Sequence, residues 1–265
     1  MAKWKKCSDC AGSGHIFEEP VAGFVFVKDC QTCRGTGRVP ASEDPYADQL
    51  TYYQKLSGMT PVNFFGVWEL EGRHTLPWRI TSDPWKLLLA EVLLRKTTTQ
   101  QAEKVFNKLQ NFELRDIIEI RPSVLESILE PLGMNKVRAD QLKHIALAYS
   151  IATLEDLKSD DFLISLSGIG KYISNMVRCC AFELPLPGLD TNMIRILQRF
   201  FGWESKKTRA REDKDFWTFA ESLVPTNNPK EYNWAVMDFG ALVCTKQNPK
   251  CDQCPLNSKC IYFEI

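Results

Sequence analysis

The sequence has no apolar run that approaches the roughly 20 residues needed to cross a bilayer. Its start, MAKWKKCSDC, also lacks the apolar core of a secretory signal peptide. From these two absences we do not expect an integral membrane protein. They predict an intracellular, cytoplasmic protein that has no membrane partner.

Neither sign of charge is in excess, because 33 Lys and Arg residues balance 33 Asp and Glu residues. A pI near 6.8 argues against the uniformly basic surface of a protein that coats nucleic acid. Basic residues nevertheless outnumber acidic ones over residues 166–212, and the reverse holds over residues 111–165. A local basic face predicts DNA binding at one site, although a run of charge can also be a solvated surface.

Cysteine is abundant, with 10 residues in a chain of 265, and most of them fall in two tight clusters. In a reducing compartment such clusters favour metal sites over disulfides. The chain is 44% hydrophobic and 25% charged. A chain of this length and composition can bury a sizeable core and hold two or three small domains.

The first cluster contains two Cys-x-x-Cys pairs, CSDCAGSG and CQTCRGTG, with a hairpin-like segment GFVFVKDC before the second pair. This spacing is typical of a four-thiolate zinc site. Each pair resembles the repeat of DnaJ-type zinc-binding domains, but no J-domain signature accompanies it. We therefore predict a zinc module over residues 1–40 and a linker over residues 41–62. The module either staples a small fold or binds DNA or a protein partner. Its expected ligands are Cys7, Cys10, Cys30 and Cys33.

The second cluster has the spacing C-x6-C-x2-C-x5-C. Four thiolates so close in sequence indicate one metal site, but spacing alone does not separate zinc from an iron–sulfur cluster. Lys246 and Lys250 lie between the first two cysteines and would face phosphates if this loop approaches DNA. The four cysteines are Cys244, Cys251, Cys254 and Cys260.

The stretch LSGIGKY contains a Gly-Ile-Gly turn between two helical patterns. Leu166 and Ile169 are expected to anchor the turn in the core. The N–H groups of Gly168, Ile169 and Gly170 can then point outward at the start of the next helix, where they would bind a phosphate. Lys171 adds positive charge beside these donors.

LSGIGKY followed by LDTNMIRIL resembles the helix-hairpin-helix, Gly/Pro-rich loop, Asp superfamily of base-excision DNA glycosylases. The stretch LPWRITSDPWKLLLAEVLLRKTT and the second cysteine cluster extend the similarity from about Leu76 to Cys260. The resemblance implies an all-α, two-lobed fold that binds double-stranded DNA as a monomer. A six-helix lobe would span residues 85–187, and residues 63–84 with 188–265 would form a lobe carrying a 4Fe-4S cluster.

The pattern from Asp83 predicts an amphipathic helix with Asp83 as its N-cap and Pro84 at its first position. Glu91 lies among apolar residues of this helix. A lone Glu in such a helix usually turns outward. The resemblance to adenine and thymine mismatch glycosylases instead implies a place in the base pocket, where partial burial would raise its pKa toward the range of a general acid.

The resemblance also implies roles on DNA. Arg95 matches the position from which the family inserts a side chain into the duplex, and Lys96 would support it or touch phosphates. The alternative is a solvent-facing basic patch. Arg138, in GMNKVRADQL, is either structural or DNA-facing.

By the same resemblance, Asp190 is the catalytic carboxylate. A glycosylase flips its target nucleotide out of the stack, and cleavage of the N-glycosidic bond develops oxocarbenium character on the sugar. Asp190 would stabilise that charge and orient water, while Glu91 would assist the departing base.

Bifunctional, endonuclease III-like members of the family carry a Schiff-base lysine where this chain has Tyr172. Tyr172 would position the flipped nucleotide, or simply pack. GIGKY, EVLLRKTT and MDFGALVC are most similar to thymine mismatch glycosylases. We therefore expect a monofunctional glycosylase, without AP lyase activity, acting on thymine or uracil opposite guanine. The alternatives are an adenine mismatch glycosylase, a glycosylase for a modified base in foreign DNA, and a DNA-binding protein without catalysis.

Overall fold

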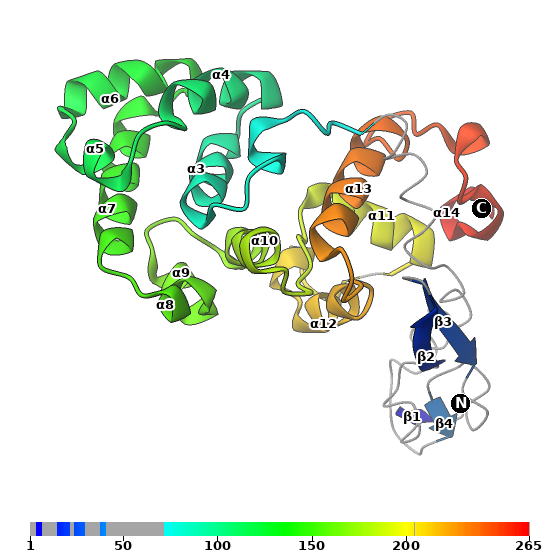
Figure 1. Cartoon of the computed structure of the whole chain (residues 1–265). Helices are drawn as coiled ribbons and strands as arrows, with labels where there is room; N and C mark the ends of the chain where they lie inside the picture. Colours follow the sequence, from blue (N-terminus) through cyan, green and yellow to red (C-terminus); the bar gives the residue numbers. More distant parts are fainter. Residues whose placement is uncertain are drawn as a thin grey trace. The chain divides into compact units, whose positions relative to one another are not determined.

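The computed structural model describes residues 4–6, 15–21, 24–29, 38–40, 72–203 and 205–264. The four expected zinc ligands and the linker over residues 41–62 lie outside these described residues. The chain forms two compact units (Figure 1). The first contains residues 189–227 and 234–265 with the N-terminal strands, and the second contains residues 72–188 and 228–233.

The N-terminal strands form two antiparallel pairs. Strand β1 (Trp4–Lys6) pairs with β4 (Arg38–Pro40), so that Lys5 lies opposite Val39. Strand β2 (His15–Val21) pairs with β3 (Phe24–Asp29), with a register shift between Glu18 and Val21. The second pair includes most of the segment that the sequence predicts to be hairpin-like.

Within residues 72–203 and 205–264, every regular element is a helix. No helix among the described residues combines the length and the apolarity needed to cross a membrane. The second unit contains η1 (Pro77–Arg79), α3 (Pro84–Leu94), α4 (Thr99–Leu109), α5 (Leu114–Glu119), α6 (Pro122–Leu129), η2 (Glu130–Leu132), α7 (Asn135–Ser150), α8 (Leu154–Lys158), α9 (Asp160–Ser165) and α10 (Lys171–Phe182).

Helix α3 begins as the sequence predicts. The Asp83 side chain accepts hydrogen bonds from the N–H groups of Trp85 and Lys86, and Pro84 occupies the first helical position. The apolar side chains that follow fill the centre of this unit: Leu88, Val92 and Leu93 are fully buried. Helix α10 packs against α3, and α5 and α6 pack against α7.

Residues 72–84 belong with the second unit, whereas the sequence assigned them to the lobe with the cysteines. The physical reason is aromatic packing. The Trp78 ring meets the Phe106 ring of α4 edge to face at 5.6 Å between centroids. The Arg73 guanidinium also donates to the Thr99 hydroxyl at the start of α4.

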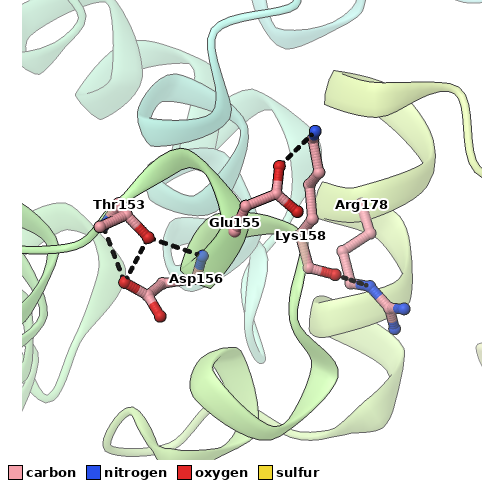
Figure 2. Close-up of polar contacts among 5 residues, drawn as sticks. All are labelled: Thr153, Glu155, Asp156, Lys158 and Arg178. Carbon is pink, nitrogen blue, oxygen red and sulfur yellow. Dashed lines mark hydrogen bonds and ion pairs between the residues drawn. The ribbon is translucent and has the colours of Figure 1, made fainter.

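Polar contacts connect α8 with α10 (Figure 2) and α9 with α10. Thr153 and Asp156 form a capping box that starts α8, and Arg178 Nε of α10 donates to the Lys158 carbonyl at its end, 2.8 Å away. Asp160 at the start of α9 accepts from Ser174 and pairs with Arg178, both on α10. These bonds fix α9 relative to α10, the two helices that flank the Gly-Ile-Gly turn.

The first unit contains the remaining helices. Its core includes an aromatic group in which the Trp203 ring stacks on Phe219 at 4.9 Å and Phe201 meets Phe219 edge to face. Helix α13 begins in the second unit and continues in the first. The helices are α11 (Thr191–Phe201), η3 (Ala210–Glu212), α12 (Lys214–Ser222), α13 (Pro229–Leu242), η4 (Cys251–Gln253), η5 (Asn257–Lys259) and α14 (Ile261–Glu264).

Candidate active site and DNA-binding turn

The turn between α9 and α10 has the form of an anion site, with two exposed glycines. Leu166 and Ile169 are buried, as the sequence predicts. Gly168 has φ +73°, a conformation that favours glycine. Gly170 is the N-cap of α10 and, having no side chain, contributes no side-chain cap to the start of that helix.

One expected donor of the turn is used internally. The N–H of Ile169 donates to the Leu166 carbonyl at 3.0 Å, so it does not point toward a ligand. Among the described residues, no partner accepts from the N–H groups of Gly168 or Gly170. Two of the three predicted backbone donors therefore remain available for a phosphate, beside the exposed Lys171.

Arg95 is linked to the turn through a residue that the sequence did not single out. The Arg95 guanidinium donates to Gln141 Oε1 at 3.1 Å, and Gln141 Nε2 donates to the Ser167 carbonyl at 2.6 Å. A methyl group placed on Gly168 would lie 2.4 Å from Gln141 Nε2 and 2.7 Å from Arg95 Nη1. Arg95, Gln141 and the turn thus form one continuous polar surface in the second unit.

Arg138 is structural. Its side chain is buried, and its nitrogens donate to the carbonyls of Gly133, Val92 and Arg95. The positive Arg138 side chain also interacts favourably with the dipole of α3, because it lies at the C-terminal end of that helix. Arg138 therefore stabilises the turn that follows α3. In this turn Arg95 is the C-cap of α3, and the exposed Lys96 has φ +54°.

Gly168 and Gly170 allow a matched test of the turn. A Cβ at Gly170 meets nothing within 4 Å, so Gly170→Leu should change the free energy of unfolding by less than about 0.5 kcal/mol. The added side chain would block a phosphate, and we expect about tenfold weaker binding to all duplex sequences and a smaller salt dependence in fluorescence anisotropy. Gly168→Ala should instead destabilise the fold by about 1 kcal/mol because its φ is positive. Unchanged DNA affinity in Gly170→Leu would show that DNA binds elsewhere.

Asp190 caps α11 in the first unit. Its Oδ1 accepts from the N–H groups of Asn192 and Met193 at 2.9 and 2.7 Å, and its Oδ2 accepts from the Asn192 side chain at 2.8 Å. Burial raises the pKa of Asp190, while these hydrogen bonds and the charge of Arg195 oppose the rise. The carboxylate is thus held in one orientation and only partly solvated.

A chain of hydrogen bonds connects Asp190 to the cysteine loop, residues 243–250 between α13 and η4, which contains Cys244. Asn192 Oδ1 accepts from Arg195 Nη2 at 2.9 Å, and Arg195 donates in turn to the carbonyls of Gly240 and Cys244, the latter at 2.8 Å. A methyl group on Gly240 would lie 2.7 Å from Asn192 Cβ, so glycine permits this close approach of α11 and α13.

The four cysteines of the second cluster line one cavity of the first unit. Burial raises the pKa of both Cys254 and Cys260, and the charges of Cys244 and Cys251 act on each of them. Arg199 Nη1 lies 3.6 Å from Cys244 Sγ and 2.7 Å from the Thr245 carbonyl. Lys246 and Lys250 are exposed. The apolar lining comprises Ile196, Phe200, Phe239, Pro249, Val243 and Leu256.

Glu91 and Tyr172 both lie in the second unit and are half-buried. Glu91 is close enough to Cys180 for its charge to help raise the pKa of that buried thiol, after the Cys179 contact and burial itself. The structure thus places Glu91 partly out of water, near the C-terminal end of α10, where Cys180 lies.

Three site residues were not identified from the sequence. Asn192 and Arg195 have a local signal, because residues three apart on a helix lie on one face, and Asp190 precedes them as an N-cap. Gln141 has none, since its partners lie 26 and 46 positions away.

Comparisons with known proteins give a family match and several similar relatives. Residues 89–222 match the family of HhH-GPD superfamily base excision DNA repair proteins. A thymine/uracil-DNA glycosylase of Pyrobaculum aerophilum is 39% identical over 199 residues, which cover 73% of this chain and 86% of that protein. An adenine DNA glycosylase of Buchnera aphidicola is 30% identical over 202 residues and is covered over 57% of its length.

A solved structure of a thermostable thymine-DNA glycosylase superposes with a TM-score of 0.70 at 30% identity, covering 77% of this chain and 94% of that one. The family match covers half of this chain, and the Pyrobaculum protein is similar over most of its own length. The chain therefore belongs to the HhH-GPD superfamily of base excision DNA repair proteins.

Proposed function

We propose that the protein is a monofunctional DNA glycosylase that hydrolyses the N-glycosidic bond of thymine or uracil opposite guanine. The observation that carries this proposal is Asp190, a partly buried carboxylate held by three hydrogen bonds at the start of α11. Asp190 comes after the glycine turn between α9 and α10, which we propose binds DNA. The chain is 39% identical to a thymine/uracil-DNA glycosylase.

The chemistry follows from the charge that develops on the sugar. As the base departs, the anomeric carbon becomes positive, and a fixed carboxylate stabilises it without reorganising. Asp190 supplies that charge and orients the attacking water. Glu91 would protonate or hydrogen-bond the departing base, and Tyr172 would hold the flipped nucleotide.

Binding of double-stranded DNA would use the hairpin turn and the neighbouring cations. Gly168, Gly170 and Lys171 would bind phosphates, and Ile169 would anchor the turn from below. Arg95 would enter the duplex in place of the flipped base, which requires its guanidinium to leave Gln141. Lys96, Lys246 and Lys250 would contact further phosphates. We expect the protein to act on DNA as a monomer inside the cell.

We propose that Cys244, Cys251, Cys254 and Cys260 hold a 4Fe-4S cluster. The four cysteines line one cavity together with apolar side chains, and four thiolates are the ligand set of such a cluster. When bound, the cluster would supply cross-links between the cysteine loop, η4 and the residues before α14.

Metal content tests the two cysteine sets together. Protein purified without oxygen should be yellow-brown and contain about four iron atoms and about one zinc per chain, the zinc held by Cys7, Cys10, Cys30 and Cys33. Inductively coupled plasma analysis measures both. Replacing Cys254 with Ser should remove iron and leave zinc. Colourless, iron-free protein would contradict the cluster.

The function itself is tested with a panel of labelled duplexes that carry T·G, U·G, A·G, A·8-oxoguanine and modified-base pairs. Hot alkali cleaves the strand at each abasic site and so reveals base release. We expect release of thymine and uracil opposite guanine. Release of adenine would support the adenine mismatch glycosylase, which is favoured by the 30% identity to the Buchnera protein. Binding without release from any duplex would identify a DNA-binding protein without catalysis.

Strand cleavage is expected to be absent. A bifunctional enzyme attacks the sugar with a nearby amine and forms a Schiff base. Tyr172 has no amine, and Lys171 lies about 100° away around α10. Borohydride should therefore trap no covalent complex with the natural protein, whereas Tyr172→Lys should gain weak trapping and nicking. A trapped complex with the unmodified protein would contradict the assignment.

A further inference from the structure

Two buried side-chain amides hold the segment that leads to Asp190. This segment, Leu184 to Leu189, contains two prolines and forms neither helix nor strand. Its main-chain polar groups therefore need partners outside regular secondary structure. Asn175 on α10 and Asn233 on α13 provide them, and their side chains are 2% and 0% exposed.

The two amides form hydrogen bonds with three consecutive residues of this segment. Asn233 Nδ2 donates to the Leu186 carbonyl at 2.9 Å, and Asn175 Nδ2 donates to the Pro187 carbonyl at 3.1 Å. The N–H of Gly188 donates to Asn233 Oδ1 at 2.6 Å. Asp190 follows two residues later, after the buried Leu189.

Asn233 is itself fixed. Its Nδ2 also donates to the Pro229 carbonyl one turn earlier on α13 and lies 3.3 Å from Cys179 Sγ. The amide presents a donor to Leu186 and an acceptor to Gly188 from one rigid planar group. Neither a carboxylate nor an apolar side chain of the same size can do both.

We propose that Asn175 and Asn233 are positioning residues for Asp190: they clamp residues 186–188 and so fix the point from which the chain reaches the catalytic carboxylate. This inference rests on the proposed glycosylase function. A displacement of about 1 Å at a reacting group lowers rates by about 100-fold. Fixing the segment therefore contributes to the chemical step and not only to folding.

The test uses Asn175→Leu and Asn233→Leu, which replace each amide with an apolar side chain of similar size. Ser174→Ala is the matched control, because Ser174 is also buried on α10 but bonds to Asp160 of α9 and not to the segment. Single-turnover base release is measured with saturating enzyme on the best duplex, alongside DNA affinity. Hydrogen exchange is followed in peptides covering residues 184–190.

We expect both Leu variants to release the base about 10 to 100 times more slowly, with DNA affinity within about threefold of the natural protein. Exchange over residues 184–190 should accelerate in both. Ser174→Ala should keep the natural rate and the natural exchange in this segment. Asn233→Asp, which retains only the acceptor to Gly188, should also be slowed.

Faster exchange with an unchanged single-turnover rate would overturn the proposal. Asn175→Leu removes a single bond to the segment and decides the matter if Asn233→Leu does not fold. The natural protein gives a second measurement: the Gly188 amide should exchange as slowly as the amides of α10, and rapid exchange would contradict the clamp. Failure of the natural protein to release any base would instead overturn the proposed function, and the exchange data would still report on the clamp.

Discussion

Replacing Asp190 with Asn should lower the rate of base release by about 1000-fold or more and leave duplex affinity within about twofold. The substitution removes the negative charge that we propose stabilises the sugar cation, while it keeps the shape of the side chain. An Asn at this position can still cap α11, because its carbonyl oxygen accepts from the N–H groups of Asn192 and Met193.

The pH dependence follows from the same group. Burial raises the pKa of Asp190 above its ordinary value near 3.8. The proposed mechanism requires the ionised carboxylate, so the rate of base release should fall as the pH falls through this raised pKa. The folded protein also binds this proton more tightly than the unfolded chain, so the ionised group costs stability as the pH rises through the window. Asp190→Asn relieves this cost but loses the hydrogen bond from the Asn192 side chain, so its stability at neutral pH should lie within about 1 kcal/mol of that of the natural protein.

Asp83→Asn is the matched control for this prediction. Asp83 caps α3 with two backbone hydrogen bonds, as Asp190 caps α11, but lies outside the proposed catalytic group. Its replacement should leave the single-turnover rate within about twofold. Retained turnover in Asp190→Asn, measured by alkaline cleavage of a T·G duplex, would remove Asp190 from its catalytic role.

The elements that the sequence predicted well are those fixed by local chemistry. Asp83 and Pro84 start α3 because an N-cap carboxylate and a proline at the first position act within one turn. The buried Leu166 and Ile169 follow from a glycine turn between two apolar patterns. The proposed role of Asp190 came from the family resemblance, and the structure adds that its side chain caps α11.

The features that the sequence did not reveal depend on contacts between distant residues. Nothing near Asn233 indicates that its amide bonds to Leu186 and Gly188, which lie more than 40 positions earlier. The contact between the Trp78 and Phe106 rings likewise has no signal in the sequence near either residue. With this contact, residues 72–84 fall in the second unit and not in the lobe that the sequence predicted. Arg138 could not be classed from its sequence neighbours, because the carbonyls of Val92 and Arg95 define its role.

Arg195 is the second residue for which we expect a large effect. It joins Asn192, the side-chain partner of Asp190, to the carbonyls of Gly240 and Cys244. Replacing it with Met would leave these acceptors without their charged donor. We expect a loss of about 2 to 4 kcal/mol in the free energy of unfolding, measured by urea denaturation, and about tenfold to 100-fold slower base release.

The sign of the accompanying pH shift distinguishes this role from loss of packing. The positive charge of Arg195 lowers the pKa of Asp190 against the effect of burial. Without it that pKa should rise further, so the acidic limb of the pH–rate profile should move to higher pH. A general loosening of the fold predicts no such direction.

Arg199→Met provides the comparison on the same helix. Arg199 donates to the Thr245 and Lys246 carbonyls and lies over the Tyr262 ring at 4.6 Å, but it has no bond to Asn192. Its loss should destabilise the cysteine loop by a similar amount and leave the acidic limb in place. If both variants shift the limb equally, or neither does, then Arg195 acts only through the stability of the first unit. A shift confined to Arg195→Met would establish that Arg195 tunes the protonation of Asp190, the proposed catalytic carboxylate, beyond its effect on stability.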